Sequence, residues 1–200
     1  MAYTLSELKK EAEWRKCCKN ERYFLENYWN IAHPAHGRIL FDLRSAQAEA
    51  LEHWQEHRYS LTLKARQIGW STLVAAHQFW LAFFHADQNI IDLSRTEREA
   101  VLLLRKTKYG FKHLPDWMLE RGPKSLMEHQ QRMGFDNGSL ITSMPSASVV
   151  ALLASPLRMV VGIFIISCGL VLLLVQTSLR LCFSLGRRLK IGETLGIKRR

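Results

Sequence analysis

One stretch near the middle of the chain constrains its fold more than any other. Residues 59 to 63 have the composition of a β-strand, a loop with Gly69 follows, and residues 71 to 85 are apolar enough for a packed helix. Residues 89 to 93 then predict a second buried strand, and residues 96 to 109 a second helix. This alternation predicts an α/β domain built on a parallel sheet.

The loop after the first strand has the residue types of a phosphate-binding loop. In the common pattern, G-x-x-x-x-G-K-[ST], backbone N–H groups and a helix N-terminus surround phosphate oxygens, while a lysine and a hydroxyl handle charge and Mg²⁺. Aligned on Gly69 and Ser71, the pattern places Lys64 at the first glycine and Trp70 at the lysine. The full pattern is therefore absent, and Lys64, or as a second choice Arg66, must supply the cation.

The loop and several segments on either side of it together form a larger, ordered pattern. The loop residues that belong to it are Lys64, Arg66, Gln67, Gly69, Ser71 and Thr72. The flanking segments are residues 24 to 31, His33-Pro34 with Gly37, Phe41 to Gln47, Leu93 to Glu97, Asn137 to Ser139 and Pro145 to Ser148. In this order they resemble phage terminase large subunits, the ATPases that pump DNA into proheads. The resemblance covers roughly residues 20 to 148.

The resemblance implies a fold, ligands and partners. The fold is an incomplete P-loop domain of the RecA-like, ASCE type, with a parallel sheet and a helical N-terminal flank. To it we add a C-terminal hydrophobic helix, which lies outside the family fold. ATP and Mg²⁺ are the implied ligands, and the implied ATP-binding residues are Gln47, Lys64, Arg66, Gln67, Gly69, Ser71 and Thr72. Ser71 would also contact Mg²⁺ through the nucleotide. Double-stranded DNA, a small terminase subunit and a portal protein would be the partners, in the cytoplasm of the host cell.

Gln47 lies in a helix that we predict for residues 42 to 57. In terminases a glutamine upstream of the loop contacts the adenine, so the resemblance gives Gln47 this part, with Arg44 as a possible helper. The alternative is a solvent-facing helix glutamine. We also predict a helix over residues 5 to 29 and a hairpin turn at Asn137-Gly138, because Asn-Gly accepts positive φ.

Composition divides the chain into three parts: a flank of residues 1–36, a partial P-loop ATPase domain of residues 37–148, and an apolar, basic tail of residues 149–200. The net charge of +10 comes mostly from the tail, which holds 8 Lys and Arg residues and 1 acidic residue. Residues 1–148 hold 20 Lys and Arg residues and 17 Asp and Glu residues. The charge is therefore weak evidence for a DNA-binding face on the globular part. The 4 cysteines show no metal spacing and no disulfide framework.

The tail also lacks the acidic residues of a P-loop motor. Hydrolysis needs an aspartate for the magnesium shell and a carboxylate to orient water, both at the end of an apolar strand. Glu193 is the only acid after residue 148, and Asp92 follows the first crossover too soon to be this aspartate. We therefore identify no catalytic residue.

Two explanations of the tail remain open. Residues 159–179 contain no charge and are long enough, as a helix, to span a bilayer. A gene frameshift near residues 146 to 150 would instead make the tail a misread product outside the family fold, and we favour this explanation. Two functional alternatives also remain: a small tail-anchored membrane protein held in the membrane by residues 159–179, and a nucleotide-binding regulator without hydrolysis.

Overall fold

The computed structural model describes residues 5–57, 59–62, 68–145, 162–166 and 172–176. The helices are α1 (Leu5–Lys19), α2 (Glu21–Tyr28), α3 (Ser45–Glu56), α4 (Trp70–Phe84), α5 (Glu97–Lys112) and α6 (Asp116–Arg121). The strands are β1 (Asn30–His33), β2 (Gly37–Leu40), β3 (Tyr59–Thr62), β4 (Asn89–Ser94), β5 (Ser125–His129), β6 (Arg132–Phe135), β7 (Leu140–Pro145), β8 (Gly162–Ile166) and β9 (Leu172–Gln176).

The main sheet has the order β3-β9-β8-β4-β7-β6-β5, and β1 and β2 form a separate antiparallel hairpin. β4 pairs in parallel with both β7 and β8, whereas the β3–β9, β8–β9, β6–β7 and β5–β6 pairs are antiparallel. The α/β class is thus confirmed, but the sheet is mixed rather than parallel. β3 and β4 run in the same direction but are not neighbours, because β8 and β9 lie between them.

The tail prediction needs correction. Residues 162–166 and 172–176 lie in the span that we expected to be one hydrophobic helix outside the main fold, but they are strands β8 and β9 of the main sheet, between β3 and β4. Long apolar runs suit a strand buried between neighbours as well as a helix, so composition alone did not separate the two. Among the residues described above, no helix is both long and apolar enough to cross a membrane.

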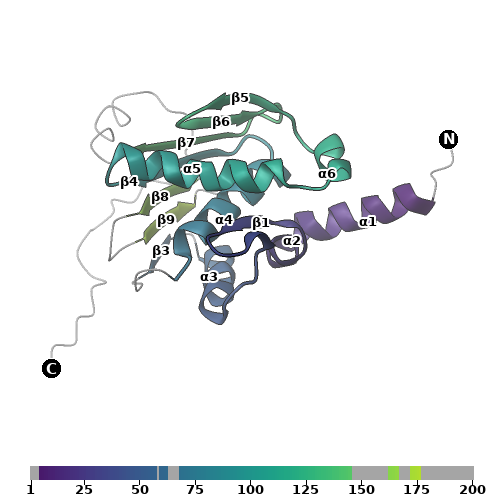
Figure 1. Cartoon of the computed structure of the whole chain (residues 1–200), viewed down its shortest axis with the longest axis horizontal. Coiled ribbons are helices and arrows are strands. Elements are labelled where there is room, and N and C mark those ends of the chain that lie inside the picture. The colour runs from purple at the N-terminus through teal and green to yellow at the C-terminus, as the bar shows by residue number, and fades with distance from the viewer. Residues whose placement is uncertain (1–4, 58, 63–67, 146–161, 167–171, 177–200) are drawn as a thin grey trace, which may run out of the picture.

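Two helices cover one region of the sheet and form the core with it. α5 lies across β4 and β7, and α4 packs beside α5 (Figure 1). α4 is the most buried helix, since every residue from Leu73 to Phe83 is buried. Phe79 illustrates this packing, because its ring lies 4.8 Å from that of Trp29 and 6.1 Å from that of Phe135. The core therefore extends from the sheet through α4 to the N-terminal segment.

The N-terminal segment is attached to the two sheet-packed helices by aromatic side chains. The Trp80 indole N–H donates to the Cys17 carbonyl at 2.8 Å, and Trp14 packs against Phe84 with centroids 4.9 Å apart. The Trp29 ring approaches Gly110 of α5 so closely that a Cβ there would lie 2.1 Å from it. These contacts make the flank part of the same core.

Most sequence-predicted elements between residues 42 and 145 are confirmed, with shifts of a few residues at their ends. Residues 5 to 29, however, form two helices rather than one, because the Asn20 side chain caps α2 by accepting from the Tyr23 N–H at 2.9 Å. The hairpin between β6 and β7 is also confirmed. Its turn differs in detail, since Gly138 has a φ of +82° and Asn137 does not have a positive φ.

Candidate functional site

The start of α4 is the part of the predicted phosphate loop that the structure describes. Gly69 precedes the helix with φ +76° and ψ 13°, and its carbonyl accepts from the Thr72 and Leu73 N–H groups. This turn directs the chain from the loop into α4. The Thr72 N–H is therefore already paired, and the N–H groups before it, those of Trp70 and Ser71, carry the partial positive charge of the helix start, which favours an anion. Ser71 and Thr72 add two hydroxyl groups in the first turn.

Gln47 of α3 contacts this turn from the side. Its Nε2 donates to the Ile68 carbonyl at 3.0 Å, and its Oε1 accepts from the Arg44 N–H at 3.0 Å. The residue is only 3 % exposed. The buried Gln47 amide thus joins the beginning of α3 to Ile68, the residue before Gly69, although Gln47 and Ile68 are 21 positions apart in the sequence.

Gly69 is required at this position for two reasons. A positive φ is unfavourable for residues with a Cβ, and a Cβ at Gly69 would lie 2.9 Å from Gln47 Nε2. The glycine therefore allows both the turn into α4 and the close approach of Gln47.

Trp70, which occupies the lysine position of the common pattern, is part of the core. It is 5 % exposed, and its ring meets that of Trp54 edge to face at 5.7 Å. This packing anchors the beginning of α4 against α3. A positively charged group for phosphate must come from elsewhere.

Lys106 of α5 supplies a positive charge that the sequence did not reveal. Its Nζ donates to Ser71 Oγ at 2.7 Å and lies 3.4 Å from Thr72 Oγ1. Desolvation lowers the pKa of Lys106 below its ordinary value. No sequence motif marks Lys106, because the contact depends on how α4 and α5 cross.

The predicted site residues thus fall into two groups. Gln47, Gly69, Ser71 and Thr72 are brought together at the beginning of α4. Lys64, Arg66 and Gln67 lie outside the described residues, so their predicted roles stay predictions.

Asp92 lies in the middle of β4 and is fully buried. Neither of its carboxyl oxygens has a hydrogen-bond partner among the described residues. Burial raises the pKa of Asp92 to about 8.

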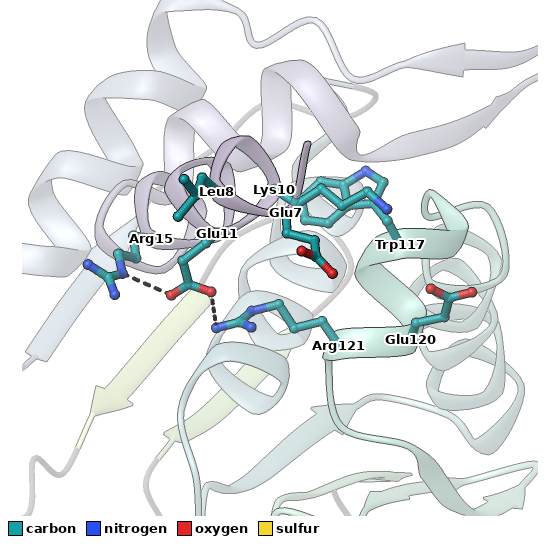
Figure 2. A pocket seen from close by; sticks show the side chains of 8 residues that line it. All are labelled: Glu7, Leu8, Lys10, Glu11, Arg15, Trp117, Glu120 and Arg121. Carbon is teal, nitrogen blue, oxygen red and sulfur yellow. Dashed lines mark hydrogen bonds and ion pairs between the residues drawn. The ribbon is translucent and has the colours of Figure 1, made fainter. Parts of the chain in front are cut away.

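A groove between α1 and α6 is a second candidate, and its volume is about 750 Å³ (Figure 2). Its lining residues are Glu7, Leu8, Lys10, Glu11, Arg15, Trp117, Glu120 and Arg121. Glu11 lies between two arginines, 2.9 Å from Arg15 Nε and 2.6 Å from Arg121 Nη2. The lining holds three acidic and three basic side chains in all, so its formal charges balance, and the groove presents less unpaired charge to a ligand than the start of α4.

A scan against protein-family models finds no match to the chain.

Proposed function

We propose that the chain binds ATP at the N-terminus of α4, as the nucleotide-binding part of a terminase-type DNA-packaging ATPase. One observation supports this proposal above the others: the Gln47 amide holds the Ile68 carbonyl beside Gly69, immediately before Ser71 and Thr72. The resemblance requires an upstream glutamine close to such a loop. A solvent-facing helix glutamine, the alternative, would not be buried against it.

The residues at this turn fit a nucleotide phosphate and its metal ion. Backbone N–H groups at a helix start and hydroxyl groups are donors to phosphate oxygens, and a serine hydroxyl is an oxygen ligand that Mg²⁺ accepts. Mg²⁺ would neutralise phosphate charge when bound. The proposed role of Ser71 is to hold this ion, and that of Lys64 is to contact the phosphates.

Gln47 has a defined task in this proposal. Both ends of its amide bind backbone groups, so it positions the loop relative to α3. The contact with adenine remains a prediction, and it would use the remaining hydrogen-bonding capacity of the same amide. Double-stranded DNA, a small terminase subunit and a portal protein are included as partners on the resemblance alone.

Titration calorimetry with ATP and Mg²⁺ tests the proposal. We expect Ser71→Ala and Lys64→Ala to weaken ATP binding about tenfold or more, because a hydrogen bond to a charged group contributes roughly 1.5 to 3 kcal/mol. Ser45→Ala is the control, since Ser45, like Ser71, lies in the first turn of a helix, although Ser45 is exposed and Ser71 is half-buried. The proposal is wrong if the unaltered chain does not bind ATP, or if Ser71→Ala and Ser45→Ala bind it equally well.

A further inference from the structure

Lys106 is held against the first turn of α4 by the packing of α5. Thr107, the next residue, is buried between the two helices: its hydroxyl accepts from Gln78 Nε2 at 2.7 Å and donates to the Ala75 carbonyl at 3.3 Å. Leu103 and Leu104 are buried on the same helix. The backbone of Lys106 is therefore fixed beside Ser71, while its side chain remains exposed.

Within the described part of the chain, the positive charge of Lys106 has no negative charge to balance it at this contact. Among the residues described by the structure, no carboxylate forms an ion pair with Lys106, and its ammonium group donates to neutral hydroxyls. It also approaches the N-terminal end of α4, where the helix dipole repels a cation. An anion at the start of α4 would interact favourably with both the dipole and the ammonium group.

We propose that Lys106 is a second phosphate-binding cation of this site and contacts the polyphosphate of a nucleoside triphosphate. This inference rests on the proposed function, which places the phosphates at the start of α4. Ser71 Oγ, which now accepts from Lys106, would be released to Mg²⁺, and the ammonium group would turn from the hydroxyl to a phosphate oxygen. Lys106 thereby distinguishes ligands by their phosphates rather than by their base.

Binding measurements with Lys106→Met test this role. The variant keeps the apolar stem that covers the helix and removes only the charged group. Lys112→Met is the matched control, because Lys112 is an exposed lysine in the last turn of the same helix and the change in net charge is the same. Lys106→Arg retains the positive charge. Each protein is titrated with ATP, AMP and inorganic tripolyphosphate, with Mg²⁺ and with EDTA, after circular dichroism has shown that its unfolding temperature matches that of the unaltered chain.

We expect Lys106→Met to weaken ATP and tripolyphosphate binding about tenfold, with the larger loss in EDTA, where no metal shares the phosphate charge. AMP binding should change less than threefold, and Lys106→Arg should recover most of the ATP affinity. Equal ATP affinities for Lys106→Met and Lys112→Met would overturn the role of Lys106 while leaving the nucleotide site intact. Failure of the unaltered chain to bind ATP would instead overturn the proposed function and this inference together.

Discussion

At the scale of single residues, Asp92 and Gln78 form an unusual pair in the core. Both are completely buried, and the Gln78 Oε1, like the two Asp92 oxygens, has no partner within the described part of the chain. Three acceptors without a donor would be costly in an apolar environment. Protonation of Asp92 removes its charge and turns one of these acceptors into an O–H donor, which lowers the cost. Burial raises the pKa of Asp92 to about 8, so this proton is present at neutral pH.

The Asp92 proton predicts how stability depends on pH. The pKa of Asp92 rises from 3.8 to about 8 on folding, so the folded chain holds a proton that the unfolded chain releases between these values. The contribution of Asp92 to the free energy of unfolding should therefore fall as pH rises from 4 to 8, by about 2 to 5 kcal/mol. Asp92→Asn, which is neutral throughout, should remove this decrease in urea unfolding measured across the range.

Asp42→Asn provides the comparison for this experiment. Asp42 is exposed, and its replacement changes the net charge by the same amount. If both variants retain the pH dependence of the unaltered chain, Asp92 is ionised in the folded protein and the assignment of its proton fails.

At the scale of elements, the junction between the loop and α4 has two independent constraints. Gly69 has a φ of +76°, and its missing Cβ leaves space for Gln47 Nε2. Gly37 shares the first constraint but not the second, because its φ is +67° and nothing lies within 4 Å of a Cβ there. The two glycines therefore separate the effect of backbone conformation from that of close packing.

Replacing each glycine by alanine should show this difference in thermal unfolding. Gly37→Ala should reduce the free energy of unfolding by about 1 kcal/mol, the usual cost of left-handed backbone for an L-residue. Gly69→Ala should reduce it by about 2 to 3 kcal/mol, because Gln47 must also move and its bond to Ile68 is strained or lost. Equal losses at both positions would mean that Gln47 does not pack tightly against the loop.

The elements that the sequence predicted well are those with strong local signals. Thr96 caps α5 by accepting from the Glu99 N–H at 3.3 Å, and Gly138 provides the positive φ of the β6–β7 turn. β8 and β9 lack such signals. Both strands lie within residues 159–179, an uncharged span that is long enough for a membrane-spanning helix. Pairing with the distant strands β3 and β4 holds these residues as strands.

The same distinction applies to the candidate site. Ser71 and Thr72 lie within one motif, and the resemblance identified Gln47 because the family has a glutamine upstream of the loop. Lys106 is 35 residues from Ser71, and its role becomes apparent only when α4 and α5 are packed together.

At the scale of the whole molecule, β8 and β9 connect the two parts of the sheet. β9 pairs with β3 over residues 172–175, and β8 pairs with β4 over residues 162–166. β3 leads into the loop, whereas β4 is followed by α5, which carries Lys106. The relative position of the two strands is thus set partly by residues from the tail. A site that depends on Ser71 and Lys106 together should be sensitive to their removal.

Two truncations test this dependence. A chain that ends at residue 176 retains every described strand, whereas one that ends at residue 148 loses β8 and β9 and leaves β3 without its described partner. We expect the chain that ends at residue 176 to unfold cooperatively, with the same thermal midpoint as the full chain. The chain that ends at residue 148 should unfold at a lower temperature and show faster amide exchange at residues 59–62. Circular dichroism and hydrogen exchange provide these measurements. If the chain ending at residue 148 matches the longer product in both, β8 and β9 do not stabilise the sheet, and the position of Lys106 beside Ser71 is set by the contact between α4 and α5 alone.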